Sequence, residues 1–250
     1  MSSAALTAEG LQKRFGAVVA AENINVTVPK GARLSLIGTN GAGKTTFVNM
    51  VTGYLKPDAG TIHLGDRDIT RLTPRQVTRL GVCRSFQIPQ LCEQLTVFDN
   101  LLVAIGTAGR RFSFFQPAGG EGAEEEAREL LDRFALDRYA DQSVSELPGG
   151  VRKLVDIAMA LARRPKVLLL DEPTSGVSSD EKFPIMDRVM QALQIEDVAI
   201  IFVEHDMEIV SRYADRVLAF YSGRIIADGP PDEVLRDAEV QRYVTGTVRA

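Results

Sequence analysis

Residues 38–45 read GTNGAGKT, and this stretch decides the fold. It fits the phosphate-loop pattern G-x-x-x-x-G-K-[ST] at every position. The apolar stretch RLSLI (33–37) precedes it and reads as a strand, while a helix over roughly 44–53 is predicted to follow. A glycine-rich loop between a strand and a helix is the context that this motif requires, so we interpret it as a phosphate-binding loop.

The residue types in this loop suit a nucleotide with its metal ion. Glycines let the backbone curl so that several N–H groups point inward, and the helix N-terminus adds partial positive charge. Lys44 can reach the β- and γ-phosphates, and the Thr45 hydroxyl can bind Mg²⁺. We therefore predict ATP and Mg²⁺ as ligands, with the nucleotide held by Gly38, Asn40, Gly41, Ala42, Gly43, Lys44, Thr45 and Thr46.

Two later stretches place acidic and imidazole groups at strand ends. VLLLDEP (167–173) is an apolar run that ends in two carboxylates, and His205 follows the apolar run VAIIFV (198–203). In a parallel sheet the carboxyl edge is where ligands bind. Asp171 is predicted to hold Mg²⁺, Glu172 to act as a general base on water, and His205 to lie near the γ-phosphate. Without the phosphate loop, each of these would read as an ordinary surface residue at a strand end.

The apolar pattern predicts an α/β fold. Strands at 166–171, 198–203 and 216–221 alternate with helices near 181–194 and 206–214, which favours a mainly parallel sheet covered on both faces. Further strands are predicted at 24–28 and 61–65, and further helices at 74–80, 96–105, 124–136 and 152–163. Residues 106–122, rich in Gly, Pro and Ser, are predicted to form a surface insertion.

Composition narrows the function class. The 250 residues carry a formal net charge of −4 with 45% hydrophobic residues, so a surface built for broad nucleic-acid binding is not expected. The two cysteines, Cys83 and Cys92, are spaced neither as a metal pair nor as a disulfide framework. Neither a signal peptide nor an apolar run long enough to span a bilayer is expected, so any work at a membrane would need other chains.

The order of these motifs resembles that of an ATP-binding-cassette ATPase, and the resemblance covers nearly the whole chain. The segment 81–104 and the ending GRIIADGPPDEV are similar to those of ATPase subunits of branched-chain amino acid importers. The resemblance implies a P-loop NTPase core, an N-terminal antiparallel β subdomain and an inserted α-helical subdomain. It also implies a single nucleotide-binding domain over 1–250, with the helical and signature part at about 88–163 and no transmembrane domain.

The resemblance assigns roles to further residues. Phe15 matches the aromatic residue that stacks on adenine, and Gln87 matches the residue that touches Mg²⁺ and the attacking water. Residues 88–100 are expected near the membrane subunits. In this family two ATPase domains face each other head to tail, so the signature residues Pro148, Gly149 and Gly150 are expected to reach the partner's ATP.

The signature departs from the family pattern LSGGQ, because Pro148 and Val151 replace serine and glutamine. Proline offers neither a hydroxyl nor an N–H to a phosphate, although its φ suits the first turn of a helix. We therefore expect an asymmetric pair, in which this chain favours a different ATPase as partner. The alternative is that Pro148 is tolerated and both sites hydrolyse ATP.

The function expected from the resemblance is that of the ATP-hydrolysing motor of an importer for branched-chain amino acids or a related small amide or organic acid. The expected partners are a second ATPase, two permease subunits and, indirectly, an external substrate-binding protein, at the cytoplasmic face of the inner membrane. One alternative is the ATPase of a lipopolysaccharide-type exporter. Another is a non-transport ATPase of the same family that acts on nucleic acid or ribosomes.

Overall fold

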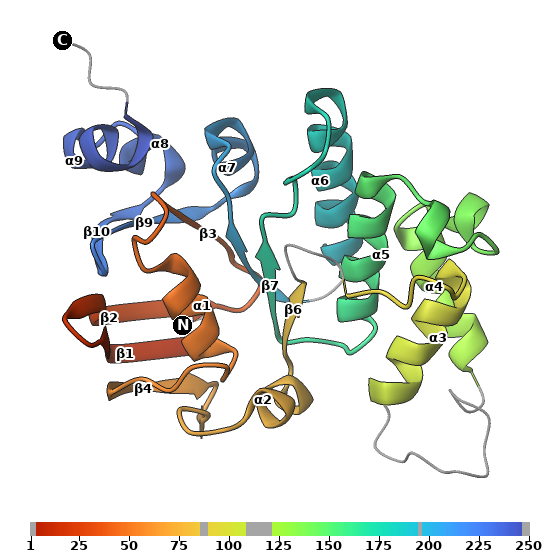
Figure 1. Cartoon of the computed structure of the whole chain (residues 1–250), viewed down its shortest axis with the longest axis horizontal. Coiled ribbons are helices and arrows are strands. Elements are labelled where there is room, and N and C mark those ends of the chain that lie inside the picture. Colours follow the sequence, from red (N-terminus) through yellow and green to blue (C-terminus); the bar gives the residue numbers. More distant parts are fainter. Residues whose placement is uncertain (1–3, 86–89, 109–121, 195–196, 247–250) are drawn as a thin grey trace.

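A computed structural model describes residues 4–85, 90–108, 122–194 and 197–246. They form two sheets and several helices (Figure 1). The helices are α1 (Lys44–Val51), α2 (Pro74–Leu80), α3 (Val97–Ala108), α4 (Ala123–Arg133), α5 (Gly149–Leu161), α6 (Ser179–Leu193), α7 (Met207–Tyr213), α8 (Pro231–Val234) and α9 (Ala238–Val240). Short 3₁₀ turns at Asp137–Tyr139 and Val144–Glu146 and a π-helical turn at Gln241–Thr245 complete the helical structure.

The larger sheet has six strands and is mainly parallel. Its order is β10 (Arg224–Gly229), β9 (Arg216–Tyr221), β3 (Arg33–Gly38), β8 (Ala199–Val203), β7 (Val167–Asp171) and β6 (Val82–Ser85). Only the outer pair β9 and β10 is antiparallel. All five residues of β8 are buried, as expected for a strand covered on both faces. The predicted parallel sheet is confirmed, with strand ends displaced by at most one residue.

The smaller sheet is antiparallel and contains β2 (Val18–Pro29), β1 (Ala4–Phe15), β4 (Ala59–Leu64) and β5 (Arg67–Asp68), in that order. The stretches predicted at 24–28 and 61–65 are parts of β2 and β4. This sheet and α1 cover one face of the larger sheet, where Leu169 and Ile201 pack with Phe47. Alternate residues of β7, Leu168 and Leu170, point to the opposite face, as the two-residue period of a strand requires.

Helices α3, α4, α5 and α6 share the core on that opposite face. In Figure 1, α3 and α4 lie at the far end of the molecule from β1 and β2. The structure confirms α2 at its predicted residues, where Thr73 and Gln76 form a capping box. Helix α3 runs three residues further than predicted, into the stretch expected as an insertion, and residues 109–121 lie outside the described residues.

The close approach of the phosphate loop to its neighbours explains the first glycine of the motif. Gly38 has a φ of +150°, and a Cβ added there would lie 2.5 Å from the carbonyl oxygen of Phe220 on β9. At Gly41, which has a φ of +80°, an added Cβ would meet no atom within 4 Å. Position 38 therefore requires glycine for two reasons, because a Cβ would clash with β9 and because its φ is one that glycine favours. Position 41 requires glycine only because of its φ.

We predict that Gly38→Ala lowers the free energy of unfolding by about 2 kcal/mol more than Gly41→Ala. The reason is that only the Cβ added at position 38 would push β3 and β9 apart. Denaturant unfolding of the two variants and the unaltered chain measures the difference. Equal destabilisation by the two substitutions would show that the loop relaxes away from β9.

Candidate active site

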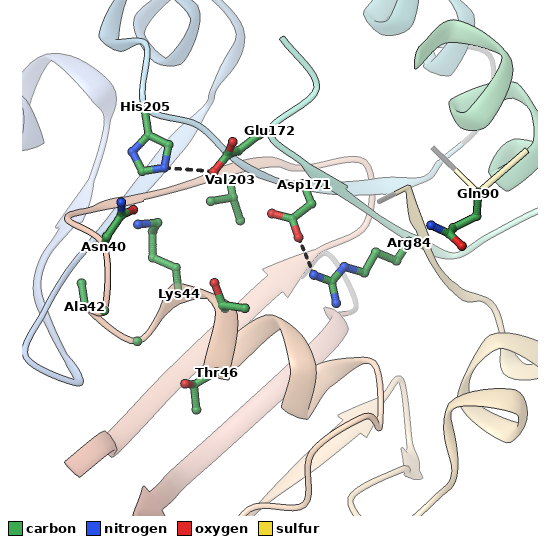
Figure 2. A pocket seen from close by; sticks show the side chains of 13 residues that line it. Asn40, Ala42, Lys44, Thr46, Arg84, Gln90, Asp171, Glu172, Val203 and His205 are labelled. Atoms are coloured by element: carbon green, nitrogen blue, oxygen red, sulfur yellow. Dashed lines mark hydrogen bonds and ion pairs between the residues drawn. The ribbon is translucent and has the colours of Figure 1, made fainter. Parts of the chain in front are cut away.

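An open cavity of about 380 Å³ lies at the carboxyl edge of the larger sheet, beyond the ends of β3, β7 and β8. Figure 2 shows side chains from the phosphate loop and from the two later strand ends converging on it. The structure thus brings together the loop, Asp171, Glu172 and His205, as the sequence predicts. The lining residues are Asn40, Gly41, Ala42, Gly43, Lys44, Thr45, Thr46, Arg84, Gln90, Asp171, Glu172, Val203 and His205.

The phosphate loop presents positive charge to this cavity. Lys44 is buried, and its Nζ donates hydrogen bonds to the carbonyl oxygens of Gly38 (2.5 Å) and Thr39 (3.1 Å). Burial lowers the pKa of Lys44, and the carboxylates of Glu172 and Asp171 oppose that change. The first N–H groups of α1 have no acceptor within their own helix, and the dipole of α1 adds partial positive charge. This end of the cavity is suited to bind phosphate.

Asp171 is held by a residue that the sequence reasoning missed. The guanidinium of Arg84, on β6, forms an ion pair with Asp171 and donates a hydrogen bond to Asn49 Oδ1 (2.8 Å). Both partners of the ion pair are mostly buried, with side-chain exposures of 11% and 17%. No local sequence pattern marks Arg84 as a partner of Asp171. Their proximity follows from the pairing of β6 with β7, which aligns Arg84 with Leu169, two residues before Asp171.

Glu172 and His205 face each other across the cavity mouth. His205 Nε2 lies 3.2 Å from Glu172 Oε1, and the Glu172 N–H donates to the carbonyl oxygen of Val203 (3.0 Å). Glu172 has a φ of +49°, a left-handed conformation that costs a residue with a side chain on the order of 1–3 kcal/mol. A strained carboxylate residue at a cavity is a candidate for chemistry.

A buried glutamate, Glu204, supports this pair. Glu204 is 3% exposed, and its Oε1 accepts hydrogen bonds from the N–H (3.1 Å) and hydroxyl (2.7 Å) of Thr174. Its Oε2 accepts from the N–H of His205 (3.1 Å). Glu204 thus joins the turn after β7 to the end of β8. The sequence reasoning missed Glu204, since in EHD it stands beside the histidine without a distinguishing pattern.

The oxygen donors at this site suit Mg²⁺. Thr45 and Asp171 offer a hydroxyl and a carboxylate, which are hard ligands, and Mg²⁺ is bound through few protein groups together with phosphate oxygens. In the described ranges, no cluster of three or more His, Cys, Asp or Glu side chains could hold a metal ion. The hydroxyl of Thr45 and the carboxylate of Asp171 fit a Mg²⁺ ion that is bound together with a nucleotide.

Other predicted site residues lie elsewhere or are outside the described residues. Phe15 ends β1 with 52% of its surface exposed and does not line the cavity. Gln87 falls within 86–89, outside the described residues, whereas Gln90, which was not predicted, lines the cavity. The signature residues Pro148, Gly149 and Gly150 do not line this cavity.

Helix α5 starts three residues before the predicted helix at 152–163 and ends two residues before its predicted end. Helix α5 begins at Gly149, and Pro148 is the residue before it, with φ −56° and ψ 150°. Its carbonyl oxygen accepts the hydrogen bond from the N–H of Arg152 (3.0 Å). At this N-cap position a serine could also accept a hydrogen bond from the first turn, whereas proline cannot.

We predict that Arg84→Met lowers the free energy of unfolding by about 3 kcal/mol, because it leaves Asp171 mostly buried beside an apolar side chain. The matched control is Arg236→Met, whose ion pair with Asp232 is 4.0 Å long and about 80% exposed, and for which about 0–1 kcal/mol is expected. Urea unfolding measures both. A small loss for Arg84→Met, similar to the control, would show that Asp171 does not depend on Arg84.

The family described as ABC transporter matches residues 21–175, more than half of the chain. The LivG proteins of Archaeoglobus fulgidus and Escherichia coli, both named as branched-chain amino acid transport ATP-binding proteins, are each 34% identical to it. The first alignment covers 96% of this chain and 95% of the relative, and the second covers 98% and 99%.

Solved structures agree with the sequence comparison. An ATP-binding cassette of an ABC transporter in its ADP conformation has a TM-score of 0.86 and 32% identity, over 96% of this chain and 97% of that one. The cbiO1 protein from Clostridium perfringens has a TM-score of 0.82 and 28% identity, over 96% and 94%. The chain therefore belongs to the ABC transporter family and is an ATPase cassette that binds nucleotide.

Proposed function

We propose that this chain is the ATP-hydrolysing motor subunit of an importer for branched-chain amino acids or a related small amide or organic acid. The names of relatives that match it over nearly their whole length support this substrate class. The observation that carries the proposal is the Glu172–His205 pair beside the phosphate loop, because it provides a carboxylate in reach of a reacting phosphate. A carboxylate within hydrogen-bond reach of water can act as a general base.

In the proposed reaction, the residues of the site bind the phosphates of ATP and activate the attacking water. Lys44 and the N–H groups of the loop bind the β- and γ-phosphates, and Glu172 accepts a proton from the water that attacks the γ-phosphate. His205 orients the Glu172 carboxylate and lies on the γ-phosphate side. Thr45, Asp171 and Gln87 would hold Mg²⁺, which when bound neutralises charge on the phosphates. The exposed ring of Phe15 is available to stack on adenine.

The proposed assembly contains two ATPase chains, two permease subunits and, indirectly, an external substrate-binding protein, with this chain at the cytoplasmic face of the inner membrane. Within the described part of the chain, no helix has the length and apolar character needed to cross a bilayer. The segment around α3 is proposed to lie near the permeases, with Leu95 and Val103 as exposed apolar side chains. Pro148, Gly149 and Gly150 are proposed to face the nucleotide of the second ATPase.

Pro148 makes a different second ATPase the favoured partner. As the residue before α5, it supplies no side-chain hydrogen bond, whereas a serine there could cap the helix or reach the opposite γ-phosphate. The loss of one hydrogen bond to a charged group is on the order of 1.5–3 kcal/mol. In a heterodimer this affects only the partner's nucleotide, and the site built on Glu172 receives the partner's own signature. In a homodimer both sites would be affected.

We predict that Glu172→Gln traps a closed ATPase dimer, because ATP still binds but water is no longer activated. Size-exclusion chromatography of the variant with ATP and the second ATPase measures the trapped species, and phosphate release should fall by roughly a hundredfold or more. Glu208→Gln, an exposed carboxylate on α7, is the matched control and should retain full activity. A Glu172→Gln variant that binds ATP but hydrolyses it at the normal rate would contradict the proposed role.

We predict that Pro148→Ser raises hydrolysis at the partner's site by roughly ten- to a hundredfold, the rate equivalent of one hydrogen bond to a charged group. The measurement is a single turnover of ATP in the heterodimer in which this chain carries Glu172→Gln, so that only the partner's site cleaves ATP and reopening of the trapped dimer is not needed. Pro230→Ser is the control, since Pro230 likewise precedes a helix, α8, far along the chain from the signature. No gain from Pro148→Ser would favour the alternative that the proline is tolerated.

A further inference from the structure

Helix α5 carries two buried ionic side chains on one face. Lys153 and Asp156 are 4% and 7% exposed, although the helix is otherwise buried through apolar residues such as Leu154 and Ile157. Residues three apart on a helix lie on the same face. Charged groups are rarely this buried unless they have defined partners, because removing them from water is costly. Their contacts therefore indicate what this face of α5 does.

Lys153 reaches the backbone of Glu172. Its Nζ donates a hydrogen bond to the Glu172 carbonyl oxygen at 3.4 Å, across 19 residues of sequence. Burial lowers the pKa of Lys153, while four surrounding carboxylates, those of Asp156, Asp171, Glu172 and Glu204, oppose that change. The ammonium group thus lies among the acidic groups of the active site without being one of the residues that line the cavity.

The hydrogen bond from Lys153 helps to hold Glu172, the residue of the site with a left-handed backbone conformation. The Glu172 N–H donates to the carbonyl oxygen of Val203 (3.0 Å). Its own carbonyl oxygen accepts both from the N–H of Ser175 (3.0 Å), within the turn, and from Lys153 on α5 (3.4 Å), so both of its peptide groups are held. A left-handed conformation persists only where the surroundings hold it. The direction of the Glu172 carboxylate toward His205 follows from that backbone conformation.

Asp156 makes corresponding contacts with the end of β6 and with Gln90. It accepts hydrogen bonds from the hydroxyl of Ser85, the last residue of β6 (2.5 Å), and from the N–H of Gln90 (3.3 Å). Gln90 lines the cavity. One helix face therefore holds two separate parts of the active site of its own chain.

We propose that Lys153 and Asp156 are positioning residues that tie the signature helix α5 to the catalytic side chains of the same chain. This inference rests on the proposed function, because the N-terminal end of α5 is the segment proposed to face the partner's nucleotide. Through Lys153, a shift of α5 driven by that nucleotide would move the Glu172 backbone. The helix is thus a physical connection between the two ATP sites of the dimer.

The test uses Lys153→Met in the assembled transporter. We expect kcat for ATP hydrolysis to fall by about tenfold or more, because the contact positions Glu172, and KM for ATP to change by less than about twofold, because Lys153 does not touch the nucleotide. Lys153→Gln, which keeps a donor, should recover part of the loss. The matched control is Lys56→Met, since Lys56 also donates to backbone carbonyls, those of Gly53 (3.2 Å) and Leu72, and does not line the cavity.

A double-mutant cycle separates positioning from stability. If Lys153 acts through Glu172, Lys153→Met should cause no further loss in a Glu172→Gln background, whereas any effect of Lys56→Met should multiply with it. Additive losses, equal kcat for the Lys153→Met and Lys56→Met variants, or a parallel loss of ATP affinity and Tm would overturn the inference. Failure of the proposed function looks different, because Glu172→Gln itself would then leave hydrolysis unchanged.

Discussion

The backbone of Glu172 is the constraint on which the rest of the site depends. It follows the end of β7 with a φ of +49°. Its N–H donates to the carbonyl oxygen of Val203, and its carbonyl oxygen accepts from the N–H of Ser175 and from the ammonium of Lys153. The buried parallel pairing of β7 with β8 places that residue beside the end of β8, which brings its carboxylate to His205. This turn therefore places the Glu172 carboxylate among the side chains that line the cavity.

Buried ionic groups surround this turn and couple it to the rest of the chain. Glu204 joins Thr174 to His205, Arg84 joins Asp171 to Asn49, and Lys44 closes the phosphate loop on itself. The contacts of Glu204 with Thr174 and of Arg84 with Asp171 and Asn49 connect segments that are distant in sequence, so they hold the site rigid only when the sheet is complete. Such rigidity suits a reaction that depends on placing water and phosphate accurately.

The sequence predicted the elements and the main site residues because the phosphate loop and the apolar strands carry local signals. Gly38–Thr45, Asp171, Glu172 and His205 each stand at a recognisable strand end, and a parallel sheet brings such ends to one edge. Arg84, Glu204 and Lys153 escaped prediction because their roles depend on pairing across the sheet and on helix packing, which no local pattern encodes. The start of helix α5 was predicted three residues too late, since helix ends depend on tertiary contacts.

The central claim is that this cassette is one half of an asymmetric ATPase motor. The most direct measurement is steady-state ATP hydrolysis by the purified chain alone and after reconstitution with its permeases and the candidate second ATPase. The account predicts little activity from the chain alone, because Pro148 would face both nucleotides of a homodimer, and robust activity in the complex. Strong cooperative hydrolysis by the purified chain alone would contradict it and make a homodimer the better description.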